Sequence, residues 1–238
     1  YSDVIVLKYT KDGNCQWVQD IADEKIGRDD SKVNTIDVTS DGGIIAGGYF
    51  KGTINLNAEI SLTSKGNEDG MIIKYNSDGE CEWAQGIGGG SKEIISAVKE
   101  SFDQSVIIGG YFTSSFIKFD NGQGIVNSGN ETGMIIKYSS KGIFQGSKKI
   151  GNTSPEHVNA LARTSDNKIL AGGYFSGQID LDDDVVFKAK GSRDGMVIKI
   201  NNTEFLNAGI VRTKGIGGIG NENIKSICNT SDGGMIIA

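Results

Sequence analysis

The sequence predicts an all-β fold, a β-propeller of four-stranded antiparallel blades that repeat about every 62 residues. Two phrases recur along the 238 residues. One reads D-G-M-I-I-K-Y or a variant of it, and its copies begin at Asp3, Asp69, Thr132 and Asp194. The other reads G-G-Y-F, and its copies begin at Gly47, Gly109 and Gly172. A fixed period carried by apolar strands and Gly-rich turns is typical of a repeat architecture.

Each repeat contains four strand-like segments. In the middle repeat they run over residues 93–100, 105–113, 133–138 and 142–150, without a sustained helical period. Apolar runs such as 106–108 predict strands covered on both faces. This is the situation of a propeller blade, because each blade lies between two others.

Short turns separate the strands. Asp12-Gly13, Asp41-Gly42-Gly43 and Asp78-Gly79 are strong signals for tight hairpins. We expect type I′ turns, which require positive φ at both central residues.

A longer segment of about twenty residues joins the second strand to the third, at 51–69, 113–132 and 176–194. It differs most between repeats and carries a short alternating pattern of its own. We therefore predict an elaborated hairpin, and we expect binding to reside in these variable segments.

The glycines and aromatic residues of the G-G-Y-F phrase are interpreted as structural. The paired glycines are expected where neighbouring blades crowd near the axis. Tyr49, Tyr111 and Tyr174, together with the phenylalanines that follow them, are expected to wedge between blades as large apolar anchors.

Cys15 and Cys81 occupy equivalent positions in successive repeats, and Phe144 and Leu206 take that position later. A position that accepts Cys, Phe and Leu is predicted to be inward and apolar. Equivalent positions of neighbouring repeats are too far apart for a disulfide, so none is expected.

The chain divides into three whole blades, at 31–92, 93–155 and 156–215, and two half-blades, at 1–30 and 216–238. If the half-blades meet, they complete a fourth blade and close a four-bladed ring. If the chain is a segment of a longer array, the ring has more blades. Because the last strand stops where another G-G-Y-F phrase should follow, we expect a segment of a longer array.

Composition excludes several functions. The chain has 24 Lys and Arg against 30 Asp and Glu, a net charge of −6, and no basic stripe. It is therefore a poor candidate for binding nucleic acid or an anionic membrane surface. No apolar run has the length of a membrane span, so no membrane insertion is expected.

The run from Asp69 to Gly89, D-G-M-I-I-K-Y-N-S-D-G-E-C-E-W-A-Q-G-I-G-G, resembles the bacterial β-propeller repeat family of the seven-bladed type. The strands at 95–98 and 106–111 add to the resemblance, which covers essentially the whole chain. It implies a secreted or surface protein of bacteria and brings no shared catalytic residues. The sequence departs from the family pattern where Gly146 and Ala208 replace Trp17 and Trp83.

The densest acidic stretch is the candidate binding site. Asp180, Asp182, Asp183 and Asp184 lie in a variable segment, and alternating carboxylates can bind calcium. The matching stretches of the other repeats, 55–59 and 118–122, do not keep these ligands. A solvated acidic hairpin is the competing interpretation, and calcium is the one cofactor considered.

Two further features are interpreted as structural. The glycines of 215–220 match the G-x-G-x-x-G spacing of dinucleotide sites, but a strand rather than a helix is expected after them. His157, the one histidine, lacks the nucleophile of a catalytic triad and is expected at the surface.

These observations favour a non-enzymatic binding module, and no catalytic residues are predicted. Together with the resemblance, they predict an extracellular or cell-surface propeller that binds protein or carbohydrate and mediates adhesion. The alternative is a glycan-active hydrolase or lyase with carboxylates near the central pore. The repeats contain no reproducible acid pair for that chemistry.

Overall fold

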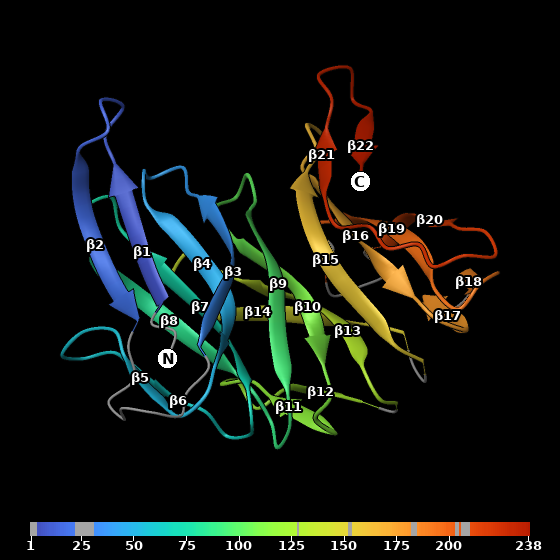
Figure 1. The fold of residues 1–238 in the computed structure, drawn as a ribbon, viewed down its shortest axis with the longest axis horizontal. Coiled ribbons are helices and arrows are strands. Elements are labelled where there is room, and N and C mark those ends of the chain that lie inside the picture. The colour runs from blue at the N-terminus through green and yellow to red at the C-terminus, as the bar shows by residue number, and fades with distance from the viewer. Residues whose placement is uncertain are drawn as a thin grey trace.

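The computed structural model describes residues 4–21, 31–127, 129–151, 154–181, 185–202, 205 and 210–238. Its regular structure is β-strand throughout. Three four-stranded antiparallel sheets stand side by side, and a two-stranded sheet flanks the row at each end (Figure 1). The predicted all-β architecture of propeller blades is therefore confirmed. No described segment is a helix long and apolar enough to cross a membrane.

The four strands of each blade pair in chain order. The first blade consists of β3 (Lys32–Val38), β4 (Ile44–Phe50), β7 (Asp69–Tyr75) and β8 (Cys81–Ile87). The middle blade consists of β9 (Glu93–Glu100), β10 (Val106–Phe112), β13 (Thr132–Tyr138) and β14 (Phe144–Ile150). The third consists of β15 (Glu156–Arg163), β16 (Lys168–Phe175), β19 (Asp194–Asn201) and β20 (Ile210–Ile216). The segments predicted for the middle repeat agree with its strands to within two residues.

The variable segments are hairpins, as predicted. Their strand pairs are β5 (Thr53–Asn55) with β6 (Ser61–Thr63), β11 (Phe116–Lys118) with β12 (Gly124–Val126), and β17 (Gln178–Leu181) with β18 (Val185–Lys188). Each hairpin forms a separate two-stranded sheet within the chain segment that connects the second strand of its blade to the third. Ile54, Ile117 and Ile179 anchor the three hairpins, because their side chains are fully buried.

The half-blades lie at opposite ends of the row (Figure 1). β1 (Val4–Tyr9) pairs with β2 (Cys15–Ile21), and β21 (Ile227–Asn229) pairs with β22 (Met235–Ile237). In the described chain neither half-blade pairs with the other, so the structure is not a closed four-bladed ring. β20 ends at Ile216, one residue beyond the predicted end of the third blade.

Apolar cores fill the spaces between neighbouring sheets. In β10, Ile108 packs toward the first blade in one core with Ile45, and Ile107 packs toward the third blade in another core with Val158. All four side chains are fully buried. Successive residues of a strand point to opposite faces, so a strand covered on both sides requires the continuous apolar runs seen in the sequence.

The expectation of large buried anchors is confirmed for the phenylalanines of the repeat and for one of its tyrosines. The side chains that are buried almost completely are those of Phe50, Phe112 and Phe175. Tyr174 is also buried, whereas Tyr49 and Tyr111 are only partly buried and fill the space between blades less completely than expected. Each Tyr precedes its Phe in the strand and points to the opposite face, close to the end of the sheet.

The crowding expected at the paired glycines is confirmed in the middle blade. A Cβ at Gly109 would lie 2.5 Å from Val158 of the next blade. A Cβ at Gly110 would lie 1.9 Å from the carbonyl oxygen of Ile94, where the register of β9 and β10 shifts. The first glycine therefore allows the blades to approach, and the second allows an irregularity within the blade.

The hairpin turns differ from the type I′ geometry that the sequence predicts. In the turn of the first blade only Gly42 has a positive φ, of 83°. The Asp41 carboxylate accepts a hydrogen bond of 2.9 Å from the Gly43 N–H, and this local bond favours the ordinary conformation at Asp41. Gln104 and Asn167 occupy the position of Gly42 in later blades, with φ of 62° and 58°.

The predicted inward position of the cysteines is wrong for Cys15, which is exposed. Its half-blade is the first sheet of the row, and no described sheet covers its outer face. Cys81 is partly buried, and burial raises the pKa of its thiol to about 11. Both thiols are free, as is that of Cys228.

Tryptophan links the outermost strand of a sheet to the next blade. The indole Nε1 of Trp83 donates a hydrogen bond of 2.9 Å to the carbonyl of Ser140, and a Cβ at Gly142 would lie 2.7 Å from its ring. Trp17 makes the same bond, of 3.0 Å, to Ser77 of the first blade. Gly146 takes this position in the middle blade, and residue 208 lies outside the described residues.

Candidate functional site

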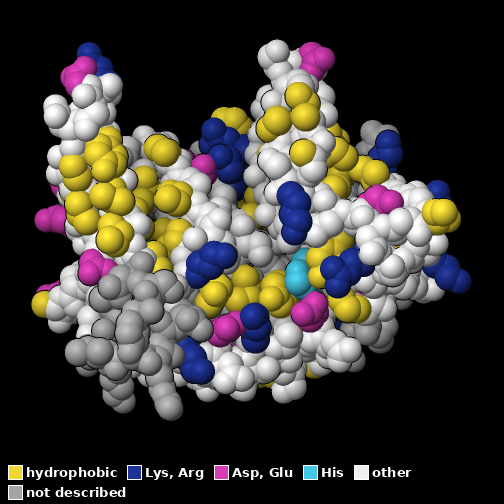
Figure 2. Space-filling model, in the orientation of Figure 1, with side chains coloured by type: hydrophobic (Ala, Val, Ile, Leu, Met, Phe, Trp, Pro, Cys, Tyr) yellow, Lys and Arg dark blue, Asp and Glu magenta, His cyan; other side chains and the backbone are white. Residues whose placement is uncertain are grey.

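The three tyrosines of the repeat lie along one end of the sheets. Each stands opposite a residue at the start of an innermost strand, in the pairs Lys32 with Tyr49, Ile94 with Tyr111, and His157 with Tyr174. A cavity of about 350 Å³ opens between these strands. We define the axial face by Lys32, Tyr49, Lys92, Tyr111, His157, Tyr174, Arg193 and Lys225. Figure 2 shows the cyan histidine with Lys and Arg side chains close to it.

Two cations of the axial face lie over tyrosine rings. The Lys92 Nζ is 5.9 Å from the centroid of the Tyr49 ring, and the Arg193 guanidinium carbon is 4.6 Å from that of Tyr174. Each contact contributes about 0.5–1 kcal/mol at an exposed site. The rings therefore hold two long, charged side chains in defined positions.

His157 lies between two of the tyrosines. Its ring stacks on Tyr111 with 3.7 Å between centroids and lies 4.6 Å from Tyr174. Its Nε2 is 2.9 Å from a carboxylate oxygen of Glu131, and its side chain is only 14% exposed, so the expected surface histidine is wrong. Burial lowers the pKa of His157, although Glu131 acts in the opposite direction. The ring is therefore neutral at neutral pH.

Among the described residues of the axial face, positive charge exceeds negative charge. Its four cations are Lys32, Lys92, Arg193 and Lys225. In the described part of the chain, the carboxylates that contact these cations or His157 are those of Glu131 and of Glu68, which lies 2.6 Å from the Lys92 Nζ. The Glu68 contact is the main reason that the pKa of Lys92 is raised. Because the whole chain has a net charge of −6, this excess is local, and it favours an anionic ligand.

The acidic candidate from the sequence is not assembled into a described site. Asp180 lies in β17, opposite Val186, and residues 182–184 lie outside the described residues. Within the described part of the chain, no three His, Cys, Asp or Glu side chains are grouped to hold a metal ion. Calcium binding by Asp180, Asp182, Asp183 and Asp184 stays a prediction.

The glycine-rich stretch 215–220 is a blade-to-blade connection. It leaves β20 at Ile216, and the Gly218 N–H donates a hydrogen bond of 3.2 Å to the Glu222 carboxylate. The described chain continues from it without a helix to β21. The helix N-terminus that a dinucleotide site requires is absent from these described residues.

Sequence reasoning missed the axial face, although one signal for it was present. The residue before the D-G-M-I-I-K-Y phrase is Glu68 in one repeat, Glu131 in the next and Arg193 in the third. Because the third repeat has Arg193 where the other two have glutamate, a cation lies over the Tyr174 ring. The other cations come from unrelated repeat positions, so aligning the copies does not bring them together.

The sequence was compared with known proteins, and no family model matches it. The chain is similar to an uncharacterized WD repeat-containing protein of Acanthamoeba polyphaga mimivirus, with 23% identity over 151 residues. That similarity covers 58% of this chain and 11% of the viral protein, so the chain spans about a ninth of that relative's length.

Among solved structures, the chain is similar to the WD40 domain of Neurospora crassa Pan2. The sequence identity is 8% and the TM-score is 0.26, over 87% of this chain and 86% of that one. The assignment of propeller blades rests on the strand order and packing of the chain itself.

Proposed function

We propose that the protein is a non-enzymatic protein-binding module, and that its axial face binds an acidic, extended segment of the partner. The observation that carries the proposal is the set of four cations and three tyrosines on one face of an acidic chain. Similarity to a WD repeat-containing protein agrees with a β-propeller repeat of this kind.

The chemistry of the axial face suits a carboxylate-bearing peptide. Lys92 and Arg193 are positioned by tyrosine rings, so less side-chain entropy is lost when they pair with an anion. Tyrosine and arginine are also the residue types that contribute most to binding at protein interfaces. The cavity of about 350 Å³ between the innermost strands adds depth to the surface.

A peptide titration tests this proposal. A fluorescent peptide of alternating Glu and Gly should bind, and its Lys–Gly counterpart should not. Arg193→Ala and Lys92→Ala should each weaken binding about tenfold, since a charge-assisted contact is worth roughly 1.5 kcal/mol. The matched control is Lys141→Ala, at an exposed turn away from the axial face. Equal affinity for both peptides, or equal loss in all three variants, would contradict the proposal.

Carbohydrate binding, adhesion and an extracellular or surface location rest on the sequence resemblance alone. The glycan-active alternative requires a free acid and base at the pore. Glu68 and Glu131, the carboxylates found at the axial face within the described residues, are instead engaged with Lys92 and His157. Hydrolysis of a glycan panel by the protein would favour the enzyme over the binding module.

A further inference from the structure

A β-bulge interrupts the innermost strand of each whole blade at the same position of the repeat. The register shifts at Asn34 in β3, at Ser96 in β9 and at Asn159 in β15, so none of the three is paired with a residue of the second strand. A bulge re-aims the side chain of its extra residue, and bulges are frequent next to functional sites. All three residues are polar.

The paired glycines of the repeat make these bulges possible. A Cβ at the second glycine of each pair would lie 1.8, 1.9 and 1.8 Å from a carbonyl oxygen of the innermost strand; the contacts are Gly48 with Lys32, Gly110 with Ile94, and Gly173 with His157. A side chain would clash with the backbone there, so glycine is required. The phrase that marks the repeat in the sequence therefore frees one polar side chain in each blade from the regular strand pairing.

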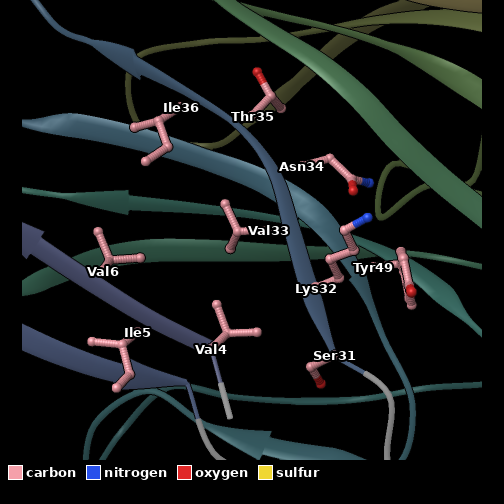
Figure 3. A pocket seen from close by; sticks show the side chains of 10 residues that line it. All are labelled: Val4, Ile5, Val6, Ser31, Lys32, Val33, Asn34, Thr35, Ile36 and Tyr49. Carbon is pink, nitrogen blue, oxygen red and sulfur yellow. The ribbon is translucent and has the colours of Figure 1, made fainter. Parts of the chain in front are cut away.

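The bulge residues lie between two cavities. The cavity of about 350 Å³ at the axial face and a second cavity of about 300 Å³ share four lining residues, which are Asn34, Ser96, Asn159 and Lys225. We define the inner subsite by these four residues. Figure 3 shows Asn34 on the same side of β3 as Lys32 and Tyr49, whereas Val33 points the other way. The inner subsite is thus continuous with the axial face.

Lys225 occupies the same repeat position as the three bulge residues. It follows Ile224 in the sequence as Ser96 follows Ile95. A Cβ at Gly172 would lie 2.8 Å from the Ile224 side chain, and a Cβ at Gly47 would lie 3.0 Å from that of Ile95. The two isoleucines therefore pack in the same way on the blade before them, and the residue after each reaches the cavities.

Two members of the inner subsite are held in place by the next innermost strand. The Asn34 Nδ2 donates a hydrogen bond of 3.0 Å to the carbonyl of Ile95, and the Asn159 Nδ2 donates one of 3.1 Å to the carbonyl of Ile224. The side chains of Ser96 and Lys225 have no hydrogen-bond or ion-pair partner among the described residues. A hydroxyl and an ammonium group are therefore available to a ligand.

The charge of the inner subsite is that of one lysine. None of its four residues is acidic. Lys99, which lines the second cavity, adds no uncompensated charge, because its Nζ lies 2.6 Å from a carboxylate oxygen of Asp37. One cation and one hydroxyl donor match a single carboxylate, which accepts charge-assisted hydrogen bonds from both.

We propose that the inner subsite receives the carboxylate of one side chain of the bound acidic segment, with Lys225 and Ser96 as its donors. This inference rests on the proposed function, because the remainder of the segment lies on the axial face. A site built to pair a polar group rejects a ligand that lacks the group, since its own donors are then left unpaired. The inner subsite therefore fixes which residue of the segment stands over the cavities.

Titration of the fluorescent Glu–Gly peptide tests the proposal. Ser96→Ala and Lys225→Gln should each weaken binding about tenfold, which is the effect of losing one hydrogen bond to a charged group. Because both donors serve the same carboxylate, the loss in the double variant should be well below a hundredfold. Ser115→Ala and Lys141→Gln, at exposed positions outside the axial face, are the matched controls and should bind as the wild type does.

Ser96→Leu separates space from charge. It fills the inner subsite without changing the charge of the axial face, and it should weaken binding at least tenfold. Thermal unfolding of each variant checks that it is folded.

The outcomes distinguish the two proposals. If the Ser96 and Lys225 variants bind as the wild type does while Arg193→Ala binds weakly, the axial face binds the segment and the inner subsite is wrong. Losses that multiply to a hundredfold in the double variant also overturn the inner subsite, because the two donors then serve separate groups. If the wild-type protein binds no acidic peptide, both proposals fail.

Discussion

The two junctions between whole blades place the same acidic residue in different surroundings. Glu93, between the first and middle blades, accepts hydrogen bonds from the N–H groups of Gly89, at 2.9 Å, and Ser114, at 3.2 Å. Glu156 takes its position between the middle and third blades and is fully buried. Neither of its carboxylate oxygens forms a hydrogen bond of regular geometry with a described residue.

The neighbours explain the difference. Burial raises the pKa of both carboxyl groups, and for Glu156 to about 8. At Glu93 the hydroxyl and N–H of Ser114 oppose the rise, but Gly177 occupies the position of Ser114 in the third repeat. A buried carboxyl with few donors is more stable neutral than charged. Duplication has preserved the backbone of the junction without preserving the charge state of its acid.

Removing the acid from the second junction should have the largest effect. The folded pKa of Glu156, about 8, is above its unfolded value, so its contribution to stability is complete at low pH and falls as pH rises toward 8, by about 1.4 kcal/mol per pH unit. Glu156→Gln removes the buried charge, so it should raise the free energy of unfolding at pH 9 and not at pH 4. We expect a gain of about 2 kcal/mol at pH 9, less than the full effect of the pKa shift, because the amide also loses some hydrogen bonding. Urea unfolding at the two pH values measures this.

The matched control for that variant is Glu93→Gln. It removes a carboxylate that accepts two backbone hydrogen bonds, so it should destabilise the protein at pH 9. A similar gain in both variants would show that the junctions do not differ.

Removing the serine should make the first junction resemble the second. Ser114→Ala deletes the hydroxyl that opposes the raised pKa of Glu93. We expect a loss of about 1 kcal/mol at pH 7 and a smaller loss at pH 4.5, where more of the carboxyl is protonated in both states. Ser115→Ala, at an exposed neighbouring position, should change little at either pH. A loss that is independent of pH would mean that the serine acts through packing or through the 2.8 Å hydrogen bond that it accepts from the Ser91 N–H, and not through Glu93.

The histidine that follows Glu156 should have the smallest effect. The pKa of His157 is lowered, so its contribution to stability is complete above about pH 6.5 and falls as pH decreases below that value. His157→Phe keeps a ring between Tyr111 and Tyr174, and it should reduce the loss of stability between pH 7.5 and pH 5. Thermal melts at several pH values measure it. Ile94→Phe, at the equivalent position of the first junction, should leave the decrease of stability at acid pH as it is in the wild type.

The sequence alone predicts the positions of the strands correctly, but it does not predict the type of the turns between them. Alternation and apolar runs predict strands because a blade buries both faces, and the strand order then follows from the hairpins. The turn type could not be predicted, because it depends on which N–H donates to one aspartate side chain, here that of Gly43 to Asp41. The exposure of Cys15 likewise depends on which sheet stands beside it.

The axial face was beyond sequence reasoning for a different reason. Its four cations are as far apart in the chain as Lys32 and Lys225, and each occupies a different position of the repeat. The comparison of copies emphasises what they share, such as the buried phenylalanines. The charged side chains over Tyr49 and Tyr174 belong to what they do not share.

The tryptophan contacts have a mechanical consequence. An indole ties β2 to the first blade and another ties β8 to the middle blade, but Gly146 leaves the outermost strand of the middle blade without one. Under tension applied along the row, the first two junctions between sheets are held by an indole hydrogen bond in addition to their packing. The junction between the middle and third blades lacks this bond. Rupture should therefore come first at one of the two later junctions, because Ala208 also stands in place of the tryptophan in the third blade.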